Sequence, residues 1–358
     1  KITNLIQAIY SDVSFKVTDG KQESTERKQR AGIRQGCPLS PYLFILLLTI
    51  ITHDAEDNLT PQQRRTVLEG LPHATDVKEL FYADDTLIMT RTPMAAQLLL
   101  AVIEQESAKY NLKLNYTKCI HIPMNDARRI RYRNGQLVPT EVRATYLGGL
   151  IQAKGGHKQE LHHRITSTWG VVKKLDLLWR RAPVSLKWKL RIYNAVIVSR
   201  ALYGLETIPL TPADDDKLNA FHNRGLRKLL RIKHSFWSRV SNQEVIKQAN
   251  ERAKLKEDKV LTPLSQVLTR RQISLYAHLL RASETDPMKK ISFNQNGSRK
   301  RANWRRVGRP RTKWYDTTKT KVIQLLIRKG IVPQNWDQIM RYEEVDTLIA
   351  EAANERII

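Results

Sequence analysis

Two adjacent acidic residues carry the clearest chemical potential in this sequence. Asp84 and Asp85 lie between an apolar run at 80–83 and a second apolar run at 86–89. Carboxylates this close repel each other, and each raises the other's pKa unless a cation lies between them. Paired divalent metal ions relieve that repulsion and hold the attacking and leaving oxygens of a phosphoryl transfer in line. The pattern predicts a metal-binding hairpin tip or, more simply, a polar turn, where aspartate is common.

A glycine-punctuated segment upstream favours the first interpretation. Residues 32–44 read Gly-Ile-Arg-Gln-Gly-Cys-Pro-Leu-Ser-Pro-Tyr-Leu-Phe. Small glycines let a backbone come close to a template–nucleotide pair, and the amide of Gln35 can hydrogen-bond beside that pair. The segment and the Asp-Asp hairpin together resemble motifs B and C of the reverse transcriptases of non-LTR retrotransposons. The resemblance implies template and nucleotide contacts at Arg34, Gln35 and Gly36, and Mg²⁺ ligands, if the enzyme is active, at Asp84 and Asp85.

Further segments extend this resemblance over at least residues 1–325. Residues 112–118 look like motif D, with Lys118 at the place of a lysine associated with proton delivery to the leaving pyrophosphate. Tyr146, Leu147 and Gly148 look like motif E, the primer grip. Other similar stretches are Leu-Tyr-Gly-Leu-Glu at 202–206, the basic helix at 226–230 with Arg-Val-Ser-Asn at 239–242, and Gly-Arg-Pro-Arg-Thr-Lys-Trp at 308–314.

The resemblance also implies a motif A aspartate, which lies in the family on a strand upstream of motif B. Only 31 residues precede Gly32 in this chain, and none of their acids, Asp12 included, has a motif A context. We therefore expect a partial palm in which Asp84 and Asp85 hold a metal weakly. A palm sheet without that strand has an edge that must be covered, so we expect a protein partner near 1–30 and 77–90. The family's zinc knuckle and endonuclease domain are not seen, so self-contained retrotransposition is not expected.

The hydrophobic pattern predicts an α+β fold: a partial right-hand polymerase palm followed by a mostly helical thumb and a C-terminal helical extension. Strands are expected near 112–122 and 144–152, and a hairpin at 77–89. After Gly156 apolar residues recur at three- and four-residue spacing, which is typical of amphipathic helices. The expected helices are 93–110, a long helix from about 161 to 178, and 185–205, 212–232, 241–250, 262–283, 312–329 and 334–353. The predicted parts are a palm at 1–152, a thumb and post-thumb region at 153–283, a basic linker at 284–311 and C-terminal helices at 312–358.

Composition points to a nucleic-acid partner. The 358 residues include 61 Lys+Arg against 35 Asp+Glu, a net charge of +26. Proteins that lie along phosphates gain affinity from such an excess, because each neutralised phosphate releases counterions. Two cysteines are too few for a disulfide framework or a Cys-rich zinc site. No apolar stretch is long enough for a bilayer, so no membrane partner is expected.

The positive charge is clustered. Arg224, Arg227, Lys228 and Arg231 recur at helical spacing and predict one cationic helix face. Residues 299–329 hold twelve Lys+Arg against one acid, with Trp304 and Trp314 among them. Arginine with tryptophan suits RNA, because rings stack on unpaired bases; the alternative is that Trp314 anchors the segment on the core. The remaining predicted nucleic-acid-binding residues are Lys173, Lys174, Arg180, Arg181, Arg299, Lys300, Arg301, Arg305, Arg306, Arg309, Arg311 and Lys313.

Three histidines, His157, His162 and His163, lie close together, but only Glu160 accompanies them, so they are expected to be surface residues. The sequence favours an RNA-binding protein derived from a reverse transcriptase, catalytically incomplete and serving as a structural subunit of a ribonucleoprotein such as an organellar ribosome. Its partner would be RNA or an RNA–DNA hybrid. The alternative is an RNA-directed DNA polymerase whose fingers and motif A come from a missing or separate chain. The compartment stays open.

Overall fold

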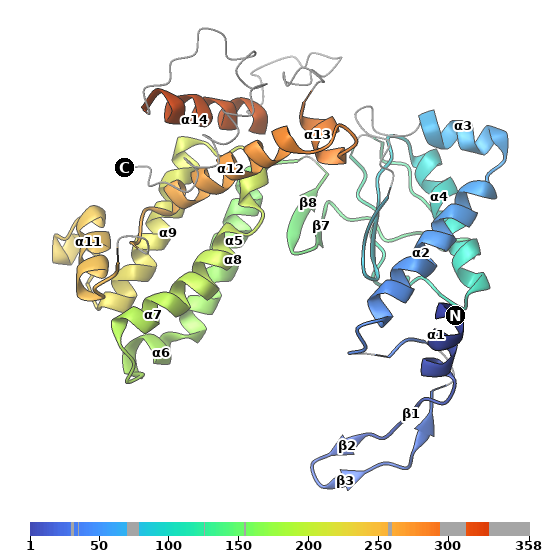
Figure 1. Cartoon of the computed structure of the whole chain (residues 1–358). Coiled ribbons are helices and arrows are strands. Elements are labelled where there is room, and N and C mark those ends of the chain that lie inside the picture. Colours follow the sequence, from blue (N-terminus) through green and yellow to red (C-terminus); the bar gives the residue numbers. More distant parts are fainter. Residues whose placement is uncertain are drawn as a thin grey trace. The chain divides into compact units, whose positions relative to one another are not determined.

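The computed structural model describes residues 1–29, 32–34, 36–69, 79–124, 126–153, 155–256, 260–293 and 313–328. The chain forms two compact units. Unit 1 comprises the described residues of 1–71, 78–121 and 128–139, and unit 2 those of 122–127 and 140–358. Figure 1 shows the elements of each unit. No helix in the described part of the chain combines the length and apolarity that a bilayer span requires.

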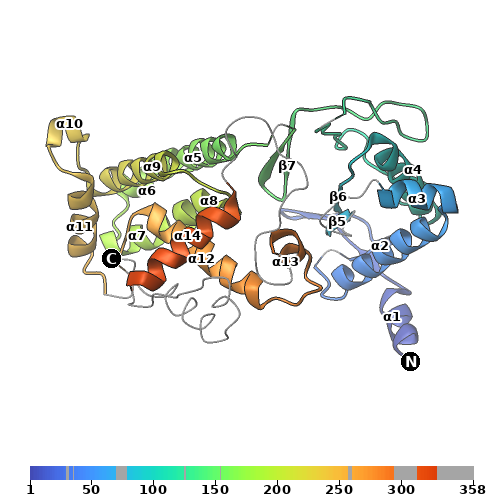
Figure 2. The same cartoon turned by 90° about the horizontal axis from the view of Figure 1, so that it is seen from above.

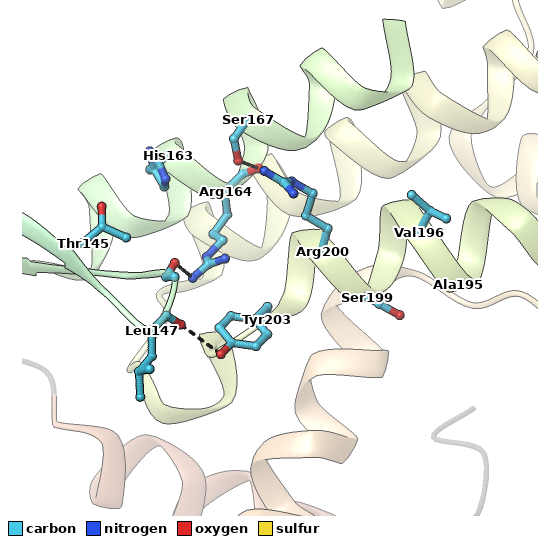
Figure 3. Close-up of a pocket in the computed structure, with 11 residues that line it drawn as sticks. Thr145, Leu147, His163, Arg164, Ser167, Ala195, Val196, Ser199, Arg200 and Tyr203 are labelled. Carbon is cyan, nitrogen blue, oxygen red and sulfur yellow. Dashed lines mark hydrogen bonds between the residues drawn. The ribbon is translucent and has the colours of Figure 1, made fainter. Parts of the chain in front are cut away.

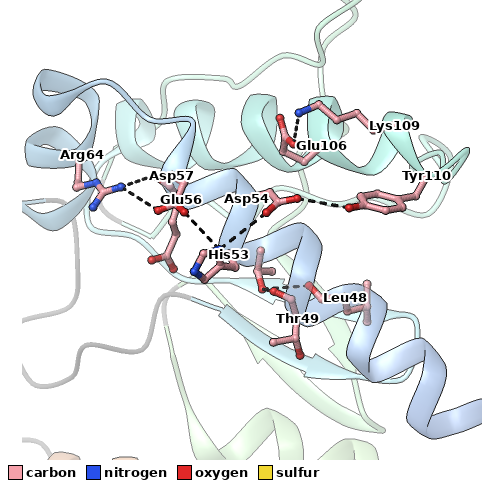
Figure 4. Close-up of polar contacts among 11 residues, drawn as sticks. Leu48, Thr49, His53, Asp54, Glu56, Asp57, Arg64, Glu106, Lys109 and Tyr110 are labelled. Carbon is pink, nitrogen blue, oxygen red and sulfur yellow. Dashed lines mark hydrogen bonds and ion pairs between the residues drawn. The ribbon is translucent and has the colours of Figure 1, made fainter. Parts of the chain in front are cut away.

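Unit 1 joins four described helices to short hairpins. Helices α2 and α3 both pack against α4, and Figure 4 shows the polar contacts around them. The Tyr110 hydroxyl donates to Asp54 at 3.4 Å, and the Arg64 guanidinium donates to the Glu56 carbonyl at 2.8 Å. The elements are α1 (Ile2–Tyr10), β1 (Ser14–Phe15), β2 (Thr18–Asp19), β3 (Gln22–Glu23), β4 (Arg27–Lys28), α2 (Ser40–Asp57), α3 (Pro61–Glu69), β5 (Glu79–Tyr82), β6 (Asp85–Ile88) and α4 (Pro93–Lys109).

Every sheet among the described residues is a two-stranded antiparallel pair: β1 with β4, β2 with β3, β5 with β6, and β7 (Arg143–Tyr146) with β8 (Gly149–Gln152). The predicted strand at 112–122 is wrong. Its side chains alternate between half-buried and exposed positions, but its backbone bonds locally: the Leu112 amide donates to Ser107, and those of Lys118 and Cys119 donate to Asn115. An alternating pattern without a neighbouring strand does not make a ladder.

Unit 2 is a helical body. Helices α5 and α9 lie side by side, and both views show this (Figures 1 and 2). After β7 and β8 its elements are α5 (His157–Lys174), α6 (Asp176–Arg181), α7 (Leu186–Ile192), the π-helical turn η1 (Tyr193–Val198), α8 (Ser199–Leu202), the 3₁₀ turn η2 (Leu205–Thr207), α9 (Pro212–Leu230), α10 (Ser235–Ser238), α11 (Asn242–Arg252), α12 (Leu264–Arg281), α13 (Pro287–Ser292) and α14 (Trp314–Arg328).

The main core of unit 2 lies between α5, η1 and α9. Trp179, Tyr193 and Leu226 are fully buried there. Gly225 is required by this packing, because a Cβ at that position would lie 2.4 Å from the Tyr193 hydroxyl. A second cluster joins α12 to α14 through Tyr276 and Val322, among others. The cores fix α5, α9 and the π-helical turn as a rigid frame, since close-packed interiors tolerate little displacement.

Helical periodicity predicted most of unit 2 correctly, and the α+β class agrees with the helices and antiparallel strand pairs found. The long helix expected from about 161 to 178 begins earlier, at His157, and is divided at Leu175 into α5 and α6. The helix expected at 185–205 contains a π-helical turn. The expected linker at 284–311 contains the helix α13, and its residues 294–311, like the helix expected at 334–353, lie outside the described residues. The palm and thumb assignments and the four predicted part boundaries stay predictions.

Candidate nucleic-acid interface

The acidic pair lies on a hairpin, as expected, but with a different turn. Tyr82 pairs with Asp85, so the two-residue turn is Ala83-Asp84, and Asp85 is the first residue of β6. Ala83 adopts a left-handed φ of 52°. Both carboxylates are exposed. Within the described ranges, no group of three or more His, Cys, Asp or Glu side chains could hold a metal ion together.

The segment 32–44 leads from a loop into α2. Gly32 and Gly36 have φ values of 84° and 86°, which favour glycine, and Arg34 is exposed. The Ser40 hydroxyl donates to the Arg34 carbonyl at 2.7 Å, so it braces the loop instead of capping α2. Leu39 is the N-cap residue, and Gln35 lies outside the described residues. The hydroxyl of Ser40, the first residue of α2, therefore holds the preceding loop against the start of the helix.

The predicted motif D lysine lies on a local turn. Lys118 is exposed, and its amide donates to the Asn115 carbonyl at 3.0 Å. The neighbouring Tyr116 stacks on Tyr132 with a centroid distance of 4.0 Å. These contacts hold the backbone around Lys118 and leave its ammonium open to solvent.

The turn between β7 and β8 is the most strongly positioned of the predicted site segments. Tyr146 pairs with Gly149, and the turn residues Leu147 and Gly148 have φ values of 47° and 75°. Two positive φ values suit the twist of a tight hairpin, but leucine pays steric strain there. Such strain persists only where surrounding contacts hold the residue in place.

Unit 2 supplies those contacts from two helices. Arg164 donates to the Gly148 carbonyl, and Tyr203 donates to the Leu147 carbonyl at 2.9 Å. Glu160 accepts from the Leu150 amide at 2.9 Å and from Arg164 Nε at 2.6 Å, and both charged side chains are nearly buried. The Arg164 guanidinium also lies 4.8 Å from the Tyr203 ring centroid. The turn is thus fixed to α5 and to the end of α8.

A pocket of about 640 Å³ opens beside this turn. Figure 3 shows the residues that line it, among them Arg164 and His163 of α5, Val196 of η1 and Arg200 of α8. Arg200 is exposed and makes no ion pair with any residue in the described part of the chain. Single π-helical turns are rare in proteins, and those that occur are often found at functional sites. The arrangement suits an anionic group through Arg200, because Glu160 already compensates the charge of Arg164 and no carboxylate lines the pocket. The lining residues are Thr145, Leu147, Gly148, His163, Arg164, Ser167, Ala195, Val196, Ser199, Arg200 and Tyr203.

The predicted cationic face of α9 needs a correction. Arg227 is only 8% exposed, because its guanidinium bonds the segment 233–242, and it is a packing residue instead of a surface cation. Lys228 is engaged as well, in an ion pair of 2.6 Å with Asp176. Arg224 is exposed over the Trp169 ring, 4.2 Å from its centroid. Helical spacing identified the residues but could not tell which of them face the neighbouring segments.

The other predicted basic residues divide by position. Lys173, Lys174 and Arg181 are exposed, and Arg180 is exposed although it pairs with Asp176. Arg231 is also exposed and donates to the Arg180 carbonyl. Lys313 is exposed at the start of α14. The residues Arg299, Lys300, Arg301, Trp304, Arg305, Arg306, Arg309 and Arg311 lie outside the described residues.

The alternative role of Trp314 agrees with its contacts. Its indole donates to the Glu206 carbonyl at 2.6 Å and its ring lies 6.0 Å from that of Tyr276.

A role for Arg200 and the pairing of Glu160 with Arg164 were not predicted from the sequence. Glu160 and Arg164 are four residues apart on α5, and that spacing could have indicated an ion pair. Nothing in the sequence places Arg200 beside residues 147–148.

Comparison with known proteins agrees with the motifs. Residues 1–149 match the family described as reverse transcriptase (RNA-dependent DNA polymerase). The chain is 24% identical over 242 residues to the RNA-directed DNA polymerase from mobile element jockey of Drosophila funebris, covering 64% of this chain and 25% of that protein. It is 25% identical over 231 residues to the retrovirus-related Pol polyprotein from type-1 retrotransposable element R2 of Popillia japonica, covering 60% of this chain and 30% of that protein.

The match therefore spans between a quarter and a third of the length of these two relatives. The resemblance to non-LTR retrotransposon reverse transcriptases is confirmed, and the chain carries a reverse-transcriptase-family domain. That family implies binding of RNA or DNA, and its polymerases generally use Mg²⁺ when active.

Proposed function

We propose that this chain binds RNA, or RNA paired with DNA, through the cationic pocket of unit 2, and that it serves as a structural subunit of a ribonucleoprotein. The observation that carries the proposal is the turn at Leu147 and Gly148, which is fixed beside Arg200 and His163. A rigid backbone turn beside the Arg200 cation suits a sugar–phosphate backbone, because phosphate contacts position a nucleic acid without reading its sequence.

The charge of the whole chain supports the same proposal. A net charge of +26 attracts any polyanion and raises its association rate. The exposed Lys173, Lys174 and Arg181 extend the positive surface of unit 2. An organellar ribosome is one particle in which such a subunit would serve.

A second candidate is an RNA-directed DNA polymerase that is completed by further polypeptide. The observation that favours it is the hairpin β5–β6, which exposes Asp84 and Asp85 together. Carboxylate oxygens suit Mg²⁺, which would stabilise the charge that develops on the transferred phosphoryl group. Within the described residues these two carboxylates have no third partner, so this candidate needs a further carboxylate.

The first experiment measures binding and particle size. The chain would be isolated from its native source and sized before and after ribonuclease treatment. A structural role predicts a large particle that shrinks with ribonuclease and an isolated chain that binds RNA. A small, ribonuclease-resistant complex together with no RNA affinity of the isolated chain would overturn the proposal.

Primer extension separates the two candidates. The chain would be tested with a primed RNA template, Mg²⁺ and nucleotides, alone and with the upstream segment of a relative. The structural role predicts no extension and RNA binding unchanged by Asp84→Ala. Extension that is lost in Asp84→Ala, but kept in Asp19→Ala as a control on an unrelated hairpin, would establish the polymerase.

A further inference from the structure

Two large aromatic side chains stand exposed on one short helix of unit 2. Phe236 and Trp237 of α10 are 62% and 74% exposed. Their ring centroids lie 5.0 Å apart with the planes nearly perpendicular, at 88°. Tryptophan is usually well buried, so an exposed aromatic pair is informative in a way that a single exposed leucine is not. Both rings keep exposed surface, although the Arg239 guanidinium lies over the Phe236 ring.

The segment that carries the pair, residues 233–242, is held in place by a side chain of α9. The buried Arg227 donates to the Lys233 carbonyl at 3.3 Å and to the Ser238 hydroxyl at 3.4 Å. It also donates to the Val240 carbonyl at 2.6 Å and to Asn242 at 3.2 Å. One guanidinium therefore fixes both ends of the 233–242 segment. Exposed rings on a fixed backbone lose little conformational entropy when they bind, which favours a binding role.

The segment of the chain that carries the pair is basic. From Lys217 to Gln243 the sequence contains seven lysines and arginines and no aspartate or glutamate. The Arg239 guanidinium lies 5.6 Å from the Phe236 ring centroid, and Lys233 precedes the helix. The next acid along the chain is Glu244, five residues after Arg239, and Asp176 is paired with Lys228 and Arg180. An aromatic surface on a basic segment is complementary to a polyanion that offers flat rings.

We propose that Phe236 and Trp237 form a stacking platform for unpaired bases of a single-stranded nucleic acid, while Arg239 and Lys233 attract its phosphates. Every base has a face that can stack on an aromatic ring, so such a platform binds single strands with little sequence preference. Paired bases in a duplex are stacked on each other and cannot use it. The inference rests on the proposed nucleic-acid function and adds a second site to it, which selects unpaired segments.

The test compares two ligands and a small set of variants of the full chain. Affinities would be measured at one salt concentration for a uridine oligonucleotide and for an RNA duplex of the same length. Trp237→Ala is expected to weaken oligonucleotide binding by about tenfold and to leave duplex binding unchanged. Trp237→Phe should keep most of the affinity because it keeps a ring, whereas Trp237→Leu should behave like Trp237→Ala.

Trp188→Ala is the matched control. Trp188 is a second exposed tryptophan of unit 2, but the Arg191 guanidinium already covers its ring, 4.4 Å from the centroid. It should leave both affinities nearly unchanged. Cross-linking of a 4-thiouridine oligonucleotide to the unaltered chain should label residues 233–239, which tests the site without any substitution.

Each outcome decides something. Equal losses with Trp188→Ala and Trp237→Ala, full affinity in Trp237→Leu, or cross-links confined to other segments would overturn the platform. Unchanged binding of both RNAs by all variants would leave a protein as the occupant of α10 and would also overturn it. If the unaltered chain binds neither RNA, the proposed function fails together with the platform, whereas duplex binding alone removes only the platform.

Discussion

The hydroxyl of Tyr203 donates a hydrogen bond of 2.9 Å to the carbonyl oxygen of Leu147, a residue 56 positions earlier in the chain. Leu147 has a left-handed φ of 47°, which its side chain disfavours. The bond therefore helps to hold a strained turn beside the pocket. Tyr203→Phe removes only the hydroxyl and should lower the free energy of unfolding by about 1 kcal/mol. Urea denaturation measures this, and Tyr42→Phe, an exposed tyrosine of α2, serves as the control.

The pair of Glu160 and Arg164 should show strong coupling. Removal of one member of a nearly buried ion pair leaves the other charge without compensation, at a cost of about 3–5 kcal/mol. Glu160→Ala and Arg164→Ala should each destabilise unit 2 by an amount of that order. The double variant should cost clearly less than the sum, and a double-mutant cycle from chemical denaturation measures the difference. Additive losses would show that the pair does not act as a unit.

Arg200 should contribute one phosphate contact. Each neutralised phosphate adds about 0.9 to the slope of log affinity against log salt concentration on duplexes. Arg200→Ala should therefore weaken RNA binding and reduce that slope by about 1, with no change in thermal stability, because the side chain is exposed. A salt titration of RNA binding provides the measurement. Arg65→Ala, an exposed arginine of α3, should leave the slope unchanged, and an equal reduction there would show that only net charge matters.

Buried His222 should make stability depend on pH. Burial lowers its pKa to about 4 from an ordinary value near 6.5. The unfolded chain then binds more protons than the folded chain between these values. Stability should fall as pH decreases from about 6.5 to about 4, by roughly 3 kcal/mol in total. Melting temperatures across this range measure the slope. His222→Gln should flatten the slope, and substitution of the exposed His53 should not.

Arg227 should behave as a structural residue despite its place in a basic run. Arg227→Lys keeps the charge but cannot reach four acceptors at once, so about 2–3 kcal/mol of stability should be lost. Arg224→Lys, one turn earlier and exposed, should change stability by less than about 0.5 kcal/mol. Chemical denaturation distinguishes the two. Equal losses of stability in Arg227→Lys and Arg224→Lys would show that Arg227 is a surface residue, as helical spacing alone suggests.

The sequence predicted local features well where interactions between residues close together in the chain determine them. The hairpin at 79–88 and the helices α4, α9 and α12 follow from apolar periodicity, proline at helix starts and turn residues. The order of the motifs predicted the resemblance to non-LTR retrotransposon reverse transcriptases, which is confirmed, and the excess of positive charge predicts a nucleic-acid ligand. The strand expected at 112–122 failed, because alternation of side chains does not supply the neighbouring strand that a ladder needs.

Only the tertiary structure decided which charges face solvent and which segments meet. Arg227 and Arg224 are indistinguishable by spacing, yet one is a buried anchor and the other lies on the surface, because the 233–242 segment folds back over α9. Packing of α5 and α8 likewise brings Arg164 and Tyr203 to the strained turn at Leu147 and leaves Arg200 exposed beside it. The sequence by itself determined the resemblance to reverse transcriptases, the net charge and most of the described helices. Their packing decided the pocket, since contacts between residues far apart in the chain leave no periodic trace.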